Sequence, residues 1–361
     1  MVPAAVKTSF DRLTPLQARS VLAIAVLAAM LLVGVTLSPL RSGYADAPDR
    51  GPGDVELYNA EVQRIQAGQS YYDAAAAELR QRGYPTRSVF NWRMPLPVWL
   101  IGVLPDPAIG KALLGVAALA LSLLAFGWMH DECGMRAALG CTLLLSGALL
   151  PCFLGDLFVM PELWSGVFIA LSAAAYGREC RKLAVVAGLT ALLLRELAAP
   201  YCVLCIALAL YERRPRELAG WFIGLTLYFA YFGLHVSHVL PRIGPADVAH
   251  ANSWICFGGA AFVISTVQMN AYLLLLPQWV AAVYLAGAML GAASWRSPGG
   301  QRIGLTLALY VIALGIIGQP FNQYWGSMTA PLFCFGAARL PATLSVLLRR
   351  AFPHPAVVAT A

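Results

Sequence analysis

Charged side chains are scarce in this sequence, and their scarcity excludes an ordinary soluble domain. Asp, Glu, Lys and Arg make up only 12% of the 361 residues, whereas hydrophobic residues make up 59%. Soluble globular domains carry about 25% charged residues. The sequence therefore predicts an all-α polytopic membrane protein, whose core is packed among membrane-spanning helices.

A nucleic-acid-binding surface is missing as well. The formal net charge is +7, but the basic residues are spread over many short loops and form no patch interleaved with aromatic residues. Nucleic-acid-binding domains gather their basic residues on one face or along one helix. We therefore expect no nucleic-acid partner, and membrane orientation explains the basic residues better.

Metal and redox motifs are also weak. Most of the eight cysteines lie in apolar stretches, where cysteine behaves as a small hydrophobe. Cys202 and Cys205 form a CxxC motif without a nearby histidine cluster, and His235 and His238 lack a third ligand. We expect neither a metal site nor a redox site. No internal repeat is evident, which counts against the inverted-repeat transporter folds.

Long apolar stretches are what the sequence has in abundance. A membrane-spanning helix needs about 20 apolar residues, or fewer inside a bundle. On this criterion we predict about ten spans, at 18–38, 108–128, 137–154, 160–176, 183–195, 199–211, 218–238, 271–293, 303–318 and 327–347. The first lacks a clear cleavage site and is interpreted as a retained anchor. The fifth and sixth are short, and either cross fully or form a re-entrant pair. Segments 94–105 and 254–267 are too short to cross.

The distribution of Lys and Arg predicts the orientation of these spans. With the N-terminus inside, most basic residues of the short loops fall on the cytoplasmic side. The domains expected are a cytoplasmic tail 1–17, the first span 18–38, an outer loop 39–107, a membrane core 108–240, an outer loop 241–270, the spans of 271–348 and a cytoplasmic tail 349–361. High Ala and Arg content favours a bacterial inner membrane.

One long polar segment, residues 41–93, separates the first two spans. It contains Gly-Pro-Gly-Asp at 51–54, which stops an upstream helix and places Asp54 at an N-cap or in a first helical turn. Asp54, Tyr58, Glu61 and Ile65 then recur at helical spacing and share one face. We expect a short helix beside the membrane, with Asp54 either a plain helix cap or part of a site.

Further polar candidates lie near the predicted outer face, where ionisable residues at a membrane are costly and tend to be functional. They are Arg93, Asp156, Glu162, Arg195 and Glu196. Glu162 follows Pro161 and is either a first-turn acid that suits the helix dipole or a site residue. Arg195 either pairs internally with Glu196 or binds a phosphate. Asn322, Gln323, Tyr324 and Trp325 suggest an interfacial aromatic belt, or else line a site.

The order of these features resembles a known family. Asp-x-x-x-Tyr-x-x-x-Val at 54–62, then Gln-Ala-Gly-Gln-Ser-Tyr-Tyr-Asp-Ala at 66–74 and Arg-Met-Pro-Leu-Pro at 93–97, is similar to the first extracytoplasmic loop of the GT-C superfamily. These membrane glycosyltransferases use polyprenyl-phosphate sugars. The resemblance covers about residues 18–240. The long stretch between the first span and Asp54, and the lack of a large soluble C-terminal domain, depart from the family pattern.

The resemblance implies a reaction and a set of roles. A sugar would pass from a polyprenyl-phosphate donor to the hydroxyl of a glycan, lipid or protein acceptor outside the cytoplasm, with inversion and with no cofactor. Asp54 would act as general base. Arg93 or Arg195 would stabilise the phosphate leaving group. Glu162 or Asp156 would hold hydroxyl groups, and Glu196, Tyr58 and Glu61 would complete the binding site.

Two other functions compete with this one. A transporter or flippase would use buried ionisable groups as its path. A non-catalytic membrane scaffold would use Asp54 and Arg195 only as structural residues. A transferase site should be reachable from the outer side and the lipid, whereas a transporter site is reachable from both sides in turn. The sequence does not identify the sugar, the polyprenyl chain, the acceptor or the oligomeric state.

Overall fold

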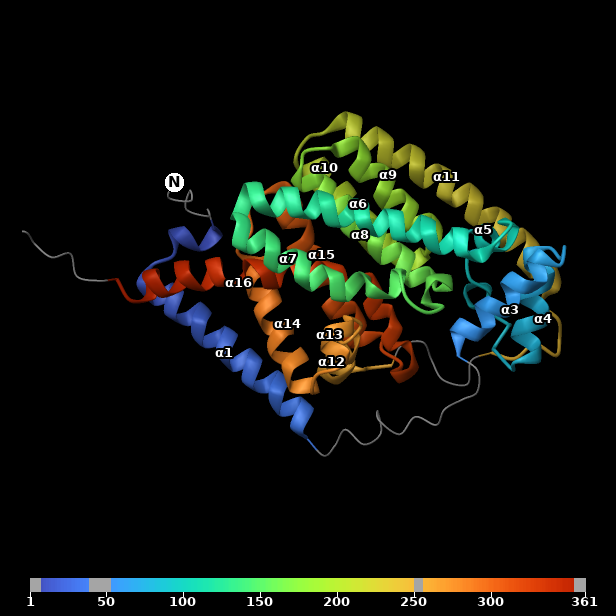
Figure 1. Ribbon diagram of the computed structural model, residues 1–361, viewed down its shortest axis with the longest axis horizontal. Coiled ribbons are helices and arrows are strands. Elements are labelled where there is room, and N and C mark those ends of the chain that lie inside the picture. The colour runs from blue at the N-terminus through green and yellow to red at the C-terminus, as the bar shows by residue number, and fades with distance from the viewer. Residues whose placement is uncertain (1–7, 39–52, 250–255, 354–361) are drawn as a thin grey trace, which may run out of the picture.

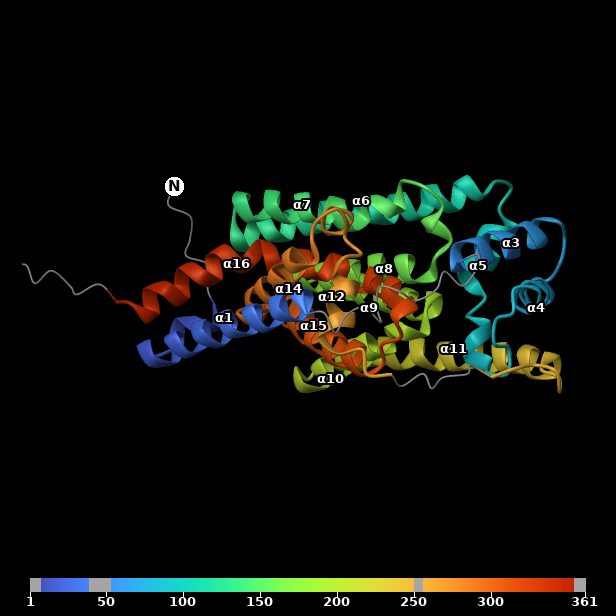
Figure 2. The same ribbon diagram turned by 90° about the horizontal axis from the view of Figure 1, so that it is seen from below.

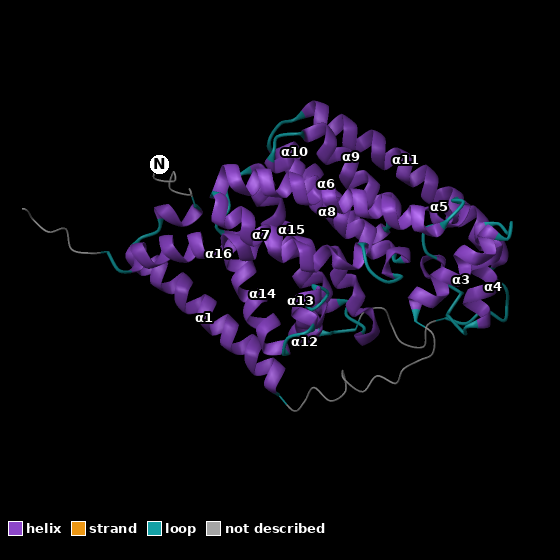
Figure 3. Ribbon diagram, in the orientation of Figure 1, coloured by secondary structure: helices purple, strands orange, loops and turns teal. Residues whose placement is uncertain are grey.

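A computed structural model describes residues 8–38, 53–249 and 256–353 of the chain. In this part of the chain the regular elements are all helices, as Figure 3 shows. The longer helices are α1 (Pro15–Leu37), α6 (Pro107–Cys133), α7 (Met135–Leu149), α8 (Pro161–Gly177), α9 (Arg181–Leu194), α10 (Ala199–Tyr211), α11 (Pro215–Val239), α14 (Gln278–Ala293), α15 (Pro298–Ile316) and α16 (Ala330–Ala351).

Shorter helices connect or cap these. The short α-helices are α3 (Asp54–Gln66), α4 (Tyr71–Gln81), α5 (Leu96–Val103), α12 (Gly259–Val267) and α13 (Ala271–Leu274). The 3-10 helices are η1 (Ser9–Arg12), η3 (Val89–Trp92), η4 (Leu150–Cys152), η5 (Leu157–Val159), η6 (Glu196–Ala198), η7 (Leu240–Arg242) and η8 (Pro320–Met328).

The architecture is that of an all-α polytopic membrane protein, as the composition predicted. Six helical segments of the described chain are long and apolar enough to cross a membrane: Pro15–Leu37, Pro107–Cys133, Met135–Cys152, Pro215–Arg242, Pro298–Ile316 and Ala330–Ala351. Their outward faces expose leucine, isoleucine and valine side chains such as Leu123, Ile223 and Ile312, as lipid contact requires. The number of ten spans stays a prediction, because several of the other helices are short.

One expected span is not continuous. The stretch 271–293 was predicted as a single helix, but α13 ends at Leu274 and α14 begins at Gln278. Pro277 precedes α14 with ψ 144°, an extended conformation. Proline has no N–H to continue a helix from Leu273, so the chain turns there and restarts. The apolar segment 94–105 forms the short helix α5, between the prolines that bracket it.

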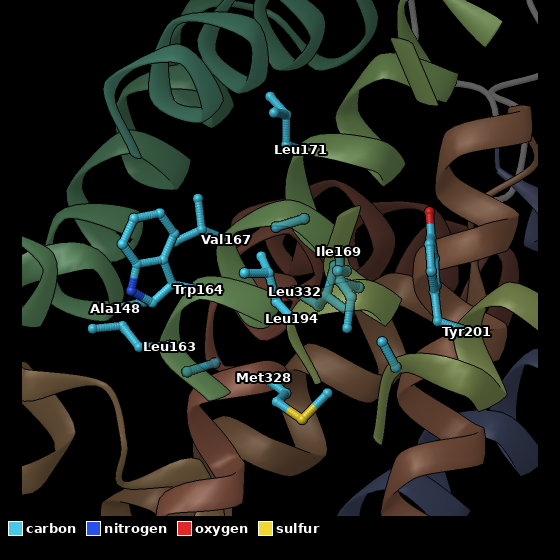
Figure 4. Close-up of a cluster of buried hydrophobic side chains, with 14 of the residues drawn as sticks. Ala148, Leu163, Trp164, Val167, Ile169, Leu171, Leu194, Tyr201, Met328 and Leu332 are labelled. Atoms are coloured by element: carbon cyan, nitrogen blue, oxygen red, sulfur yellow. The ribbon is translucent and has the colours of Figure 1, made fainter. Parts of the chain in front are cut away.

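Helix α8 forms the centre of the bundle. Nearly all its side chains are buried, and α6, α9, α15, α16 and η8 pack around it. Figure 4 shows part of this core, where Val167 and Ile169 of α8 lie near Leu194, Met328 and Leu332. Because α8 has no lipid-facing stripe, its polar residues face protein. Glu162 is therefore a buried residue although it begins an apolar helix.

Ion pairs tie the helices together at one end of the bundle. Arg181 and Arg302 both bind Glu212, with N–O distances of 3.2 and 2.9 Å. Arg178 pairs with Asp131 across the turn that follows α8. The backbone N–H of Ser9 binds the Ser294 carbonyl at 2.9 Å. We call this the inner end, after the predicted orientation, and the opposite end the outer end.

The outer end carries a separate cap, made of α3, α4, η3 and α5, which lies beyond the bundle in Figures 1 and 2. The side chain of Ile65 packs so closely on Gly102 that a Cβ there would come within 2.7 Å of it. The Tyr71 hydroxyl donates to the Trp92 carbonyl at 2.6 Å. The cap is bonded to the loop that follows α11, where Arg80 binds Asp247 at 3.1 Å. It is therefore a fixed lid over the outer ends of α8 and α9.

Candidate functional site

The site begins with the first residue of α3. Gly53 is the N-cap, and Asp54 follows it in the first helical turn, where a carboxylate is favoured by the helix dipole. Its Oδ1 accepts a hydrogen bond from the Tyr84 hydroxyl at 2.9 Å. Asp54 makes no ion pair with a described residue. Its partner is thus a phenol rather than a cation, and Asp54 has further lone pairs for a ligand.

Arg93 meets the same helix one turn further along. Its Nε donates to the Tyr58 hydroxyl at 3.1 Å, and its Nη1 donates to the Phe90 carbonyl at 3.3 Å. The residue has φ 54°, a conformation that non-glycine residues rarely adopt and that clusters at functional sites. Within the described ranges no carboxylate lies at ion-pair distance from Arg93. Its positive charge is therefore available to an anionic ligand.

Tyr58 and Glu61 line the buried face of α3, as the helical spacing predicted. They are 1% and 2% exposed. Burial raises the pKa of the Tyr58 phenol, which keeps it neutral. Burial also raises the pKa of Glu61 to about 8, against a lowering by the positive charge of Arg93. Glu61 therefore holds a proton at neutral pH, and its Oε2 has no hydrogen-bond partner in the described structure.

Glu162, Arg195 and Glu196 form a buried ion triad. Arg195 Nε lies 2.8 Å from Glu162 Oε1, and Arg195 Nη1 donates to Glu196 Oε1 at 2.6 Å. The first of these contacts is an ion pair without hydrogen-bond alignment. Arg195 follows α9 in an extended conformation, so that the turn into η6 points it back at α8. The internal pair with Glu196 that the sequence offered is thus present, and Glu162 is a second carboxylate partner, so the charge of Arg195 is already neutralised.

Four segments distant in sequence bring these groups together. The pKa of Tyr58 is raised by its burial, and then responds to the charges of Arg93, Asp54, Glu162 and Arg195. The α3 face, the loop at Arg93, the start of α8 and the α9 turn thus share one electrostatic environment. The remaining candidate is Asp156. It is exposed in the loop before η5, with no side-chain hydrogen bond or ion pair to the described part of this cluster.

Two tyrosines of the site were not among the predicted site residues. Tyr84 binds Asp54 from the loop after α4. Tyr324 lies in η8, and its phenol has a pKa raised by burial and then by the negative charge of Asp54. The sequence indicates either an interfacial belt or a site wall for the run Asn322–Trp325, and the position of Tyr324 favours the site wall. For Tyr84 the sequence holds no signal, because its pairing is purely tertiary.

No set of three or more His, Cys, Asp and Glu side chains in the described ranges is arranged to hold a metal ion. A groove of about 430 Å³ lies elsewhere, between α6, α8 and α9 near the inner end, lined by leucines and Arg178. It is remote from the polar cluster and lacks its carboxylates. The chemistry of the chain is therefore sought at the outer end, where charged groups of both signs meet.

Comparison with known proteins gives one finding of note. No family model matches the chain, and no curated protein matches it. Its fold is similar to the structure described as "Crystal Structure of ArnT from Cupriavidus metallidurans in the apo state", with a TM-score of 0.46 and 16% sequence identity. The match covers 90% of this chain but spans only 60% of that one.

Proposed function

We propose that this protein is a membrane glycosyltransferase. It moves a sugar from a polyprenyl-phosphate donor to an acceptor hydroxyl on the outer side of the membrane, with inversion. One observation carries the proposal: Asp54, paired with a neutral phenol, and Arg93, a cation without a carboxylate partner in the described structure, share one site at the end of a membrane bundle. A base beside an anion-binding cation is what displacement of a phosphate requires.

In this mechanism Asp54 is the general base. Its carboxylate accepts the proton of the acceptor hydroxyl as the oxygen attacks the anomeric carbon. The hydrogen bond from Tyr84, 2.9 Å long, holds the carboxylate in place without neutralising it. The carbon–oxygen bond to the phosphate breaks as the new bond forms on the opposite face, so the configuration inverts. Direct displacement of this kind needs no covalent sugar–enzyme intermediate and no cofactor.

Arg93 is our candidate for the phosphate leaving group. Guanidinium groups bind phosphate oxygens in a bidentate manner, and Arg93 uses its Nε and Nη1 only on neutral oxygens of Tyr58 and Phe90. Arg195 is the weaker candidate of the two, because Glu162 and Glu196 already neutralise it. The triad then holds the outer ends of α8 and α9 together and presents carboxylate oxygens to the sugar or the acceptor.

In this proposal the polyprenyl chain of the sugar donor reaches the site from the bilayer around the helices. The acceptor is a hydroxyl of a glycan, a lipid or a protein, and the transferred sugar is a hexose or a pentose. We place the protein in a bacterial inner membrane with both termini in the cytoplasm. That orientation puts the cap and Asp54 on the side where lipid-linked sugars are presented to envelope glycans.

The test compares cells that lack the protein with cells that express the wild type. Mass spectrometry would measure polyprenyl-phosphate sugars and envelope glycans in both. A transferase predicts that the deletion accumulates one lipid-phosphate sugar and loses one glycan linkage, which also identifies the substrates. Unchanged levels of every lipid-linked sugar would count against the proposal. Loss of a lipid-linked sugar from the outer leaflet alone would indicate a flippase instead.

A further inference from the structure

Two buried hydrogen-bond donors of η8 have no partner in the described structure. They are Nδ2 of Asn322 and Nε1 of Trp325, whose residues are 1% and 7% exposed. Buried polar groups are nearly always satisfied, and each exception needs an explanation, such as a ligand or water that belongs there. In a membrane bundle the requirement is stricter, because lipid offers no hydrogen bonds.

The position of η8 is fixed by close backbone packing on two sides. A Cβ at Gly166 of α8 would collide with the Ser327 carbonyl, and a Cβ at Gly326 would collide with the Thr266 carbonyl of α12. Only glycine allows helices to approach this closely. The backbone of η8 therefore cannot shift to expose Asn322 and Trp325 to solvent without losing its contacts with α8 and α12.

Element η8 borders the polar cluster described above. Glu162 lies one helical turn before Gly166 and so shares the face of α8 that meets η8. Tyr324 responds to the charges of Asp54 and Glu162. Elsewhere in the cluster, buried carboxyl oxygens are also without partners in the described structure, namely Oε2 of Glu61 and Oε2 of Glu196.

The chemistry of the two donors limits what they bind. Asn322 and Trp325 are three residues apart in η8, which is kinked at Asn322 (φ −93°, ψ 15°). The amide nitrogen and the indole nitrogen only donate. Together they match oxygen acceptors, which are either hydroxyl oxygens of a sugar or oxygens of a phosphate.

We propose that Asn322 and Trp325 form a binding subsite for these oxygens, on the wall of the site that η8 provides. The subsite rests on the proposed function, because the oxygens are those of the lipid-phosphate sugar. It assigns substrate binding to η8, which the family resemblance in residues 18–240 does not cover. The subsite would hold the lipid-phosphate sugar. The substitutions below should therefore weaken the binding of that substrate and leave the fold of the substrate-free protein intact.

The first test measures the melting temperature of the purified full-length protein. Trp325→Phe and Asn322→Leu remove donors that have no partner, so they should leave the apo melting temperature unchanged or higher. The matched controls are Trp164→Phe and Asn270→Leu. These remove buried donors that are bonded to the Phe158 and Leu144 carbonyls at 2.6 and 3.0 Å, so their melting temperatures should fall. A fall in the η8 variants equal to that of the controls would overturn the subsite.

The second test measures binding of two probes, farnesyl phosphate and farnesyl phosphoryl glucose. Loss of one donor should raise the dissociation constant roughly three- to tenfold. Weaker binding of both probes would show that the Asn322 and Trp325 nitrogens bind the phosphate. Weaker binding of the glucose-bearing probe alone would show that they bind the sugar. Unchanged affinity in both η8 variants, or no binding by the wild type, would overturn the subsite and leave ordered water as the occupant.

The subsite and the proposed function fail separately. If the wild type binds a probe through these donors but transfers no sugar in cells or in vitro, the function is wrong and the subsite stands. If the wild type transfers sugar and the η8 variants bind both probes normally, the subsite is wrong and the function stands. Asp54→Asn provides the cross-check, since it should retain probe affinity in either case.

Discussion

At the scale of single residues, the two guanidinium groups of the site are in opposite situations. Arg93 has only neutral hydrogen-bond partners in the described structure, whereas Arg195 is 1% exposed and sits between two carboxylates. Removing one partner of a buried ion network leaves an uncompensated charge and costs about 3–5 kcal/mol. Removing a cation that serves the transition state costs activity instead.

This contrast gives the first prediction. Arg93→Gln should lower sugar transfer by about 10²- to 10³-fold with little change in melting temperature. Arg195→Gln should lower the melting temperature sharply, because Glu162 and Glu196 lose their cation. Transfer assays and thermal unfolding of both purified variants would check this. Equal losses of stability in the two variants would contradict the different roles assigned to them.

Glu61 gives a prediction about pH. Its pKa is raised by burial from 4.5 to about 8, so between these values the folded protein binds a proton that the unfolded chain has lost. Stability must therefore fall as the pH rises through this window, by about 1.4 kcal/mol for each unit of pKa difference. Glu61→Gln removes the titrating group and should be more stable than the wild type by a margin that grows from pH 5 to pH 8.

Melting curves of wild type and Glu61→Gln at several pH values would measure that margin. Asn59→Asp on the less buried side of α3 serves as a control for added charge in the same helix. A margin that stays constant between pH 5 and pH 8 would show that Glu61 titrates normally, and that the buried face of α3 is more hydrated than the structure indicates.

At the scale of elements, the seat of η8 depends on glycine. Gly166→Ala would place a methyl group against the Ser327 carbonyl, which must push η8 away from α8. We expect a lower melting temperature and weaker substrate binding, since overpacking costs about 1–3 kcal/mol. Gly140→Ala in α7 is the matched control, because nothing lies within 4 Å of a Cβ there. A similar melting temperature for both variants would refute the tight α8–η8 contact.

The helices also show which features of the fold and the site could be predicted from the sequence. Apolar stretches predicted the helical membrane class, and helical spacing predicted that Tyr58, Glu61 and Ile65 share one face of a helix, which the structure shows to be buried. Two things were beyond reach. Pro277 breaks a stretch that reads as one span. Tyr84 binds Asp54 from 30 residues away, and Tyr324 comes from the last part of the chain to a place where the charge of Asp54 acts on it. The local pattern of a sequence indicates periodicity and turns, but it does not indicate which distant side chains the tertiary fold brings together.

At the scale of the whole molecule, the distribution of charge predicts which end faces the cytoplasm. Cys180 is the exposed cysteine of the described ranges and lies at the inner end, after α8. A membrane-impermeant maleimide should therefore leave Cys180 unlabelled in intact cells and label it after permeabilisation. Gln69→Cys, between α3 and α4 in the cap, should be labelled in intact cells. Peptide mapping by mass spectrometry would identify the modified residues, and the reverse pattern would invert the topology.

The role of Asp54 as the base of a sugar transfer can be measured with three purified proteins. Purified wild type, Asp54→Asn and Glu56→Gln would be assayed for transfer with the donor lipid that accumulates in deletion cells. Glu56 is the matched control, since it is an exposed acid in the same first turn of α3. Loss of a general base predicts a 10²- to 10⁴-fold fall in rate for Asp54→Asn alone, with all three proteins equally stable. Wild-type rates from Asp54→Asn would contradict the account and leave Asp54 as a first-turn acid.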